Sequence, residues 1–322
     1  MCIVAIAWQL SDELPLILLS NRDEFLQRPT ELLHQWPDQP IYAGRDCQSG
    51  GTWLGIHQQQ DLSQEQISQK LASSVVDNKN DIQQGNQQGN QQGNQQGNQQ
   101  GNQNQCYKQN GRWAAVLNFR DGAQASSDER SRGELVTGFL TGTMSPMAFA
   151  RQISLQDYAG FNLIIGDTQQ AVIVNNRGHA PMALHAGLHV FSNGQPESDW
   201  FKTERLRGRL RQEVLPLIAE DSMFEYWQDA AFSALSDNMP APIDQLPNTG
   251  FGIDVEQALS AICIEPAALT DLKSVMPNYG TRTQSILTLK AVSLDKNEDD
   301  NSVTESKFMT TLISREFNCD SS

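Results

Sequence analysis

The chain has 322 residues, and 38 Asp and Glu against 23 Lys and Arg give it a formal net charge of −15. Proteins that bind nucleic acid present a basic face to the phosphates, and anionic membrane surfaces attract basic segments, so the acidic balance argues against both partners. No apolar run approaches the roughly 20 residues that span a bilayer, which argues against an integral membrane segment.

The hydrophobic content is low, at 38%, and the cause is local. Residues 58–105 are almost entirely polar and contain five consecutive Gln-Gln-Gly-Asn units from Gln83 to Asn102. Such a repeat buries too little surface to offset its ordering entropy, so we predict a disordered insert. Self-association through the Gln/Asn tract is the alternative. The remainder is long enough for one core, and we predict a single domain over 1–322 with a second, short acidic loop near 294–306.

The N-terminal run Ile3–Leu10 is apolar, but no basic residue precedes it and two acidic residues end it early. We therefore interpret it as a buried strand of a cytoplasmic protein rather than a signal peptide. Cys2–Trp8 and Leu16–Ser20 are short apolar runs separated by turn residues, which predicts a hairpin. The polar stretch Asn21–Phe25 is predicted to leave the second strand.

The later elements are predicted from the spacing of apolar residues and from turn residues. Strands are expected within Gly50–Ile56, Gly111–Asn118, Asn162–Gly166, Ala171–Asn175, Leu188–Ser192, Thr281–Val292 and Lys307–Arg315, and helices from Ser145-Pro146 toward Ile153 and at Asp199–Leu217, Ser222–Leu235 and Asp254–Ile264. The two strands around the insert would form a plain hairpin without it, so the insert is an expanded loop tip. Strands at both ends with helices in blocks predict an α+β fold.

Metal and phosphate sites find little support. Five cysteines, with no Cys-x-x-Cys spacing, disfavour a disulfide framework or a zinc site. His179, His185 and His189 lack tight ligand spacing, so no metal is predicted. Gly50-Gly51 lacks the Lys and Ser/Thr of a phosphate loop.

Cys2 is the first candidate for chemistry. A small residue after Met is compatible with removal of the initiator Met, which would make Cys2 N-terminal. Its α-amino group, with an ordinary pKa of about 7.7–8.0, would then accept the proton of its own thiol, whose ordinary pKa is about 8.5. One residue would supply both nucleophile and base. Because many chains begin Met-Cys by chance, the pattern also fits an ordinary core residue.

A polar cluster, Asn21-Arg22-Asp23-Glu24, follows the strand predicted to pair with the Cys2 strand. It fits a strand-end cap with a surface ion pair, usually worth under about 1 kcal/mol. It also fits a guanidinium and a carboxylate that orient the N-terminal amine and thiol. The second interpretation requires a hairpin register that brings Arg22 or Asp23 beside Cys2.

Eight motifs follow one another along the chain. They are Met1-Cys2-Ile3-Val4, Asn21-Arg22-Asp23-Glu24, Gly50-Gly51-Thr52-Trp53-Leu54-Gly55, Leu117-Asn118-Phe119-Arg120, Ser131-Arg132-Gly133-Glu134-Leu135-Val136, Gly160-Phe161-Asn162-Leu163, Ser192-Asn193-Gly194 and Tyr279-Gly280-Thr281-Arg282. In this order they closely resemble the NRDE-motif family, whose animal members are called transport and Golgi organisation protein 2. The resemblance runs from Met1 to about Phe317, interrupted by the insert. More distantly, the family resembles the cysteine branch of N-terminal-nucleophile hydrolases, which includes choloylglycine hydrolase and penicillin V acylase.

The distant resemblance implies a fold and an activity. The fold is a four-layer αββα sandwich of mostly antiparallel sheets. The activity is hydrolysis or transfer at an amide, thioester or ester bond of a small acyl substrate, through an acyl-Cys2 intermediate and without a cofactor.

The same resemblance implies a set of site residues. The nucleophile falls on Cys2, the early pair on Arg22 and Asp23, the two asparagines on Asn118 and Asn193, and the late arginine on Arg282. Asp23 would partner the α-amino group, and Asn118 would donate to the oxyanion. Arg282 would polarise the nucleophile or hold a substrate carboxylate. The acylases separate the early Arg and Asp slightly, whereas here they are adjacent, so their individual roles stay open. As turn formers, Asn118 and Asn193 would have no such role.

The NRDE-motif resemblance also implies a second function. Its animal relatives are implicated in haem handling and lipid metabolism, so the same scaffold would serve as a non-catalytic haem or lipid binding or trafficking protein. A retained Met1 would favour this alternative because it removes the free amine. The sequence contains no Cys-Pro pair, which is a point against a thiolate haem site.

Overall fold

The computed structural model describes residues 2–58, 111–122, 126, 128–220, 224–266, 278–292 and 307–317. The predicted insert, apart from Gln58, and the predicted acidic loop near 294–306 lie outside the described residues.

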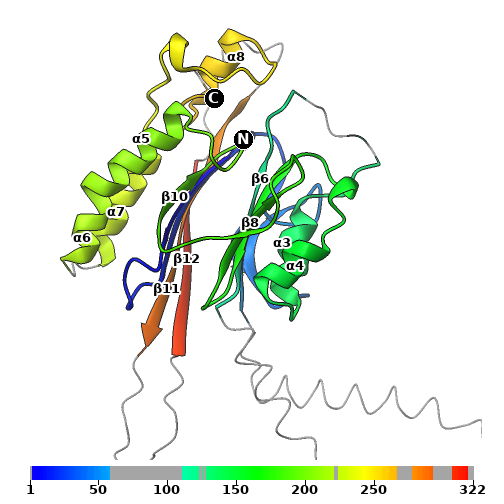
Figure 1. The fold of residues 1–322 in the computed structure, drawn as a ribbon, viewed down its shortest axis with the longest axis vertical. Coiled ribbons are helices and arrows are strands. Elements are labelled where there is room, and N and C mark those ends of the chain that lie inside the picture. Colours follow the sequence, from blue (N-terminus) through cyan, green and yellow to red (C-terminus); the bar gives the residue numbers. More distant parts are fainter. Residues whose placement is uncertain are drawn as a thin grey trace, which may run out of the picture.

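Two antiparallel sheets form the centre of the molecule (Figure 1). The first has the order β10 (Gly187–Phe191), β1 (Cys2–Trp8), β2 (Leu16–Phe25), β11 (Tyr279–Val292) and β12 (Lys307–Glu316). The second has the order β3 (Thr30–Gln35), β4 (Ile41–Asp46), β5 (Leu54–His57), β6 (Trp113–Asn118), β7 (Phe161–Gly166), β8 (Ala171–Asn175) and β9 (Met182–Ala183). β5 pairs directly with β6, so the strands on either side of the insert are a hairpin, as predicted.

Helices cover the outer face of each sheet (Figure 1). α3 (Gly133–Thr141) and α4 (Pro146–Gln152) cover the second sheet, and α5 (Phe201–Arg209), α6 (Leu215–Ala219) and α7 (Phe224–Leu235) cover the first. π-helical residues Leu210–Val214 connect α5 to α6, 3₁₀ turns occur at Leu155–Asp157 and Ile243–Gln245, and α8 (Ile253–Ala258) lies at the end near the N-terminus. The four-layer αββα prediction is confirmed. Within the described part of the chain, no helix combines the length and hydropathy that a membrane span requires.

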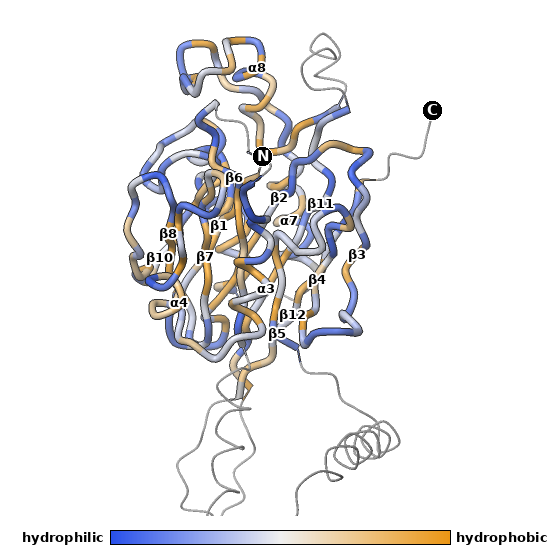
Figure 2. Tube along the Cα trace, turned by 90° about the vertical axis from the view of Figure 1, so that its right-hand side faces the viewer, coloured by the Kyte–Doolittle hydropathy of each residue, from blue (hydrophilic) through white to orange (hydrophobic). Residues whose placement is uncertain are grey.

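The alternation of β1 explains the layering. Successive side chains of a strand point to opposite faces. Cys2, Val4, Ile6 and Trp8 therefore pack between the two sheets, whereas Ile3, Ala5 and Ala7 pack against the helical layer. Figure 2 shows hydrophobic residues along the central strands and hydrophilic residues on the peripheral loops. The first residue of β1 is thus directed into the space between the sheets.

Two boundaries differ from the predictions. Asn21–Phe25 does not leave the strand, because β11 continues to pair with β2 as far as Phe25 and keeps the polar residues in the ladder. The helix predicted over Asp254–Ile264 ends at Ala258, because Ile264 is tied to the start of β11 by two hydrogen bonds with Thr281. β3, β4, β9 and α3 were not predicted.

Gly51 allows its backbone to pack closely against Gly133, the first residue of α3. A Cβ at Gly51 would lie 2.9 Å from both the Cα and the carbonyl carbon of Gly133. Backbone atoms cannot rotate away, so we expect Gly51→Ala to lower the free energy of unfolding by about 1–3 kcal/mol in urea titrations. Gly208→Ala is the control, since no atom lies within 4 Å of its added Cβ. If Gly51→Ala is as stable as the control, the contact is not tight.

Candidate active site

The hairpin register places Arg22 directly opposite Cys2. Opposite residues of an antiparallel pair point to the same face of the sheet, so both side chains face the space between the sheets. Cys2 is buried, and the Arg22 guanidinium carbon lies 4.2 Å from the ring centroid of Trp53 on the facing sheet. The next residue, Asp23, points to the other face. The hairpin register therefore brings Arg22, but not the Asp23 side chain, to the same face of the sheet as Cys2.

The Asn193 side chain bridges Cys2 and Asn118. Its Oδ1 accepts a hydrogen bond from Cys2 N at 3.2 Å, and its Nδ2 donates to the backbone oxygen of Asn118 at 2.8 Å. Ser192 Oγ donates to the carbonyl oxygen of Cys2 at 3.0 Å. These bonds connect the residues that follow β10 to the start of β1 and to the end of β6. The Asn118 side-chain amide makes no hydrogen bond with the described residues.

Asp23 is held by the neighbouring strand β11. Thr281 Oγ1 donates to Asp23 Oδ1 at 2.6 Å, and the Tyr279 hydroxyl donates to the Asp23 backbone oxygen at 2.9 Å. Burial raises the pKa of the Asp23 carboxyl, and the positive charge of Lys202 acts in the opposite direction. Asp23 thus carries its carboxyl on the helical side of the sheet, one residue from Arg22.

Arg282 lies near Arg22, on the neighbouring strand β11. It sits at an irregularity in the pairing of β11 with β2, and its Nη1 donates to the backbone oxygens of Phe25, at 3.4 Å, and of Arg28. Arg22 and Arg282 each contact Thr30 Oγ1 at 3.4 Å. The structure therefore brings Arg282 beside Arg22, and Arg282 Nη1 donates to β2, to β3 and to the connection between them.

Several charged residues of the site lie outside the predicted set. Lys202 lies in α5 and is 1% exposed. Burial lowers its pKa to about 8, and the charge of Asp23 opposes that shift. Arg120 forms a buried ion pair with Glu256 at 3.3 Å and lies 4.4 Å from the ring centroid of Trp200. Arg120 stands in one of the quoted motifs, which is a usable signal. Lys202 has no comparable signal.

Three cations interact electrostatically with the Cys2 side chain. Burial lowers the pKa of Arg22, Arg132 and Lys202, and an ionised Cys2 opposes the lowering in each case. A thiolate at Cys2 would therefore interact favourably with all three. Arg132 precedes α3, and its Nη1 donates to the backbone oxygen of Gly160 at 3.2 Å.

Asp46 anchors Arg22. Its Oδ2 lies 3.2 Å from Arg22 Nη2 and 2.6 Å from Arg28 Nε. Burial by itself would raise the pKa of the Asp46 carboxyl, but hydrogen bonds from Arg28 and from the Ser49 backbone, with the charges of Arg28 and Arg22, hold that pKa below its usual value. The carboxylate therefore stabilises the fold above a pH of about 3.9, and this contribution is lost as the pH falls through the lowered folded-state pKa.

We expect Asp46→Asn to lower the free energy of unfolding by about 1.5–3 kcal/mol at pH 7, the range for hydrogen bonds to charged groups. The difference from the wild type should shrink as the pH falls below about 3.9. Urea titrations at several pH values measure it. Asp38→Asn is the control, because Asp38 pairs with Arg45 on the surface and half of its side chain is exposed. A difference that is independent of pH would contradict the assigned role.

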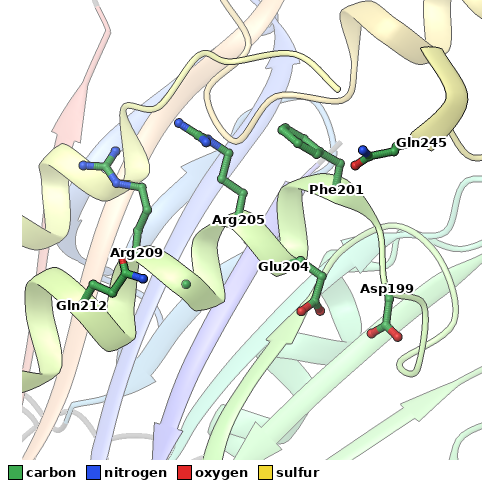
Figure 3. Close-up of a pocket in the computed structure, with 8 residues that line it drawn as sticks. Asp199, Phe201, Glu204, Arg205, Arg209, Gln212 and Gln245 are labelled. Carbon is green, nitrogen blue, oxygen red and sulfur yellow. The ribbon is translucent and has the colours of Figure 1, made fainter. Parts of the chain in front are cut away.

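A separate open hollow of about 620 Å³ lies along the outer side of α5 (Figure 3). Its lining consists of Asp199, Phe201, Glu204, Arg205, Gly208, Arg209, Gln212 and Gln245. None of these is a predicted site residue, and none is a His, Cys or Met that would ligate haem iron, so the hollow does not fit the haem alternative. Over the described ranges, no group of three or more His, Cys, Asp and Glu side chains is placed to hold a metal ion.

Comparisons with known proteins agree with the motifs. The family model described as "Transport and Golgi organisation 2" matches residues 1–87 and 92–298. The transport and Golgi organization protein 2 homolog of Homo sapiens is 27% identical over 300 residues, covering 86% of this chain and 82% of that protein. The Mus musculus homolog is 26% identical over 293 residues, with the same coverage. The chain therefore belongs to the transport and Golgi organisation 2 family.

Proposed function

We propose that the chain, once Met1 is removed, is a cysteine N-terminal-nucleophile hydrolase or acyltransferase that acts on an amide, thioester or ester bond. The observation that carries the proposal is the position of the Cys2 nitrogen. In the described chain it donates to Asn193 Oδ1 at 3.2 Å, at the start of β1 and opposite Arg22. After removal of Met1 the same nitrogen is the α-amine.

The proposed reaction proceeds in two steps. The α-amine takes the thiol proton, and Sγ attacks the substrate carbonyl carbon to form a C–S bond and a tetrahedral oxyanion. The ammonium returns the proton to the leaving group as its bond to carbon breaks, which leaves acyl-Cys2. The amine then takes a proton from water or another acceptor, which attacks the acyl carbon. The C–S bond breaks, the ammonium returns the proton to Sγ, and the acyl product leaves the free Cys2 thiol. No cofactor takes part.

Each neighbouring group has a role in this scheme. Asn193 Oδ1 orients the amine, because an acceptor there fixes the direction of its lone pair. The Asn118 amide, which has no hydrogen bond to the described residues, would donate to the oxyanion. Arg22 would stabilise the thiolate. Arg282 would help to position Arg22 through Thr30, which both arginines contact. The buried Asp23 carboxylate would offset the positive charge of Lys202.

The location of the reaction is also proposed. The described cysteines Cys2, Cys47 and Cys263 are free thiols. Thiols persist in a reducing compartment, which supports a cytoplasmic location.

The first experiment tests whether Cys2 is the mature N-terminus. 2-Cyanobenzothiazole condenses with a 1,2-aminothiol, so it should add once to the processed chain, and peptide mapping should place the adduct at Cys2. The Cys2→Ala variant and a chain with an uncleaved N-terminal extension should give no adduct. An intact mass that retains Met1, with no adduct, would overturn the proposal and leave the non-catalytic binding alternative.

A further inference from the structure

The placement of Asn193 depends on the loop that follows β10. Asn162 lies on β7, is 1% exposed, and faces this loop. Its Nδ2 donates to the backbone oxygen of Ser192 at 3.0 Å and to that of Gly194 at 2.8 Å. One buried amide thus holds the two carbonyl groups that flank Asn193.

Asn175 orients the Asn162 amide. The two residues are paired across β7 and β8, and Asn175 Nδ2 donates to Asn162 Oδ1 at 3.1 Å. Asn175 Oδ1 in turn accepts from the backbone N–H groups of Arg177 and His179, each at 2.9 Å. A backbone N–H can only donate, so these two bonds identify the Asn175 oxygen and turn its nitrogen toward Asn162. The Asn175 nitrogen in turn bonds the Asn162 oxygen, which leaves the Asn162 nitrogen directed toward the loop.

The loop is confined from the other side as well. A Cβ added at Gly194 would lie 2.6 Å from the Trp200 ring, so the backbone at Gly194 is packed against that side chain. In addition, the backbone N–H of Arg120 donates to the Asn193 backbone oxygen at 2.6 Å. The two bonds from Asn162 hold the loop from the β7 side.

We propose that Asn162 is a positioning residue, which holds Asn193 Oδ1 against the nitrogen of Cys2. The inference rests on the proposed function for its effect on turnover. Its structural content, the contact between Asn193 and the Cys2 nitrogen, can be measured without any turnover. The experiment therefore has one readout for each.

The test compares Asn162→Leu with Asn176→Leu. Asn176 is a matched control because its Nδ2 also donates to backbone oxygens, those of Leu155, Tyr158 and Ala159, and none of these belongs to the loop 192–195. Both variants lose one amide with several backbone bonds. Asn162→Ser is the milder second variant if Asn162→Leu fails to fold, because its hydroxyl is too short to reach both carbonyls.

The readout independent of turnover uses protein labelled with ¹⁵N-cysteine. In the processed chain, Asn193 Oδ1 would favour the charged ammonium, so loss of the contact should lower the pKa of the α-amine by roughly half a unit or more. In a chain with an N-terminal extension, exchange of the Cys2 amide should become about tenfold faster or more, because the hydrogen bond that protects it is lost. Asn176→Leu should change neither quantity.

The outcomes separate the two proposals. If Asn162→Leu or Asn162→Ser leaves both quantities as in the wild type, the positioning role is wrong. If they change while wild-type Cys2 forms no acyl adduct, the positioning role stands and the proposed function fails. Where an acyl substrate is turned over, Asn162→Leu should lower kcat at least about tenfold with little change in KM, and Asn176→Leu should leave both unchanged.

Discussion

Replacing Cys2 with alanine is expected to abolish acyl transfer, with a loss of at least about a thousandfold, because no other atom of the proposed site can form the acyl intermediate. Alanine is also a small residue after Met, so removal of Met1 and the free amine are retained. Turnover of simple thioesters and activated esters measures the loss. A Cys47→Ala variant, which removes an exposed free thiol, should keep the wild-type rate. Full activity in Cys2→Ala would contradict the proposed function.

The second large effect is expected at the buried ion pair between Arg120 and Glu256, whose side chains are only 1% and 4% exposed. Removing one partner leaves the other as an uncompensated buried charge, so Arg120→Met and Glu256→Gln should each lower the free energy of unfolding by about 3–5 kcal/mol. The double variant should cost clearly less than the sum of the two, since no charge then remains unpaired. Urea titrations of the four proteins measure the coupling.

An exposed ion pair provides the control for this cycle. Arg315 and Asp229 lie 3.0 Å apart, but 50% and 76% of their side chains are exposed. Removing either partner should change the free energy of unfolding by under about 1 kcal/mol. If the Arg120 and Glu256 variants behave like these, the pair is not an element of the core.

Local patterns were sufficient for most of the fold. Short apolar runs and neighbouring turn residues defined the strands beside the insert. Ser145 caps α4 as predicted, its side chain accepting from the Ala148 N–H at 3.4 Å. The end of β2 was placed too early because Asn21–Glu24 is polar, and polar residues inside a buried ladder are recognised only when the partner strand is known. That partner, β11, lies more than 250 residues away.

The site was predictable only in part. The contact between Cys2 and Arg22 follows from the register of a local hairpin, so sequence reasoning was able to anticipate it. The contact between Asn193 and the Cys2 nitrogen joins residues 191 positions apart, and the loop geometry that produces it depends on Asn162. Motif resemblance supplied Asn193, whereas spacing did not. Lys202 was missed because a lysine in an amphipathic helix is ordinarily solvated.

The central claim is that Cys2 forms an acyl intermediate. The direct measurement incubates the processed chain with a panel of acyl electrophiles, quenches in acid, and maps the modified peptide by mass spectrometry. We expect one acyl group on the N-terminal Cys2 peptide, and hydroxylamine should release it. In a chain whose N-terminal extension blocks the amine, acylation of Cys2 should be much slower. Acylation at other residues only, or at Cys2 with the same rate when the amine is blocked, would contradict it.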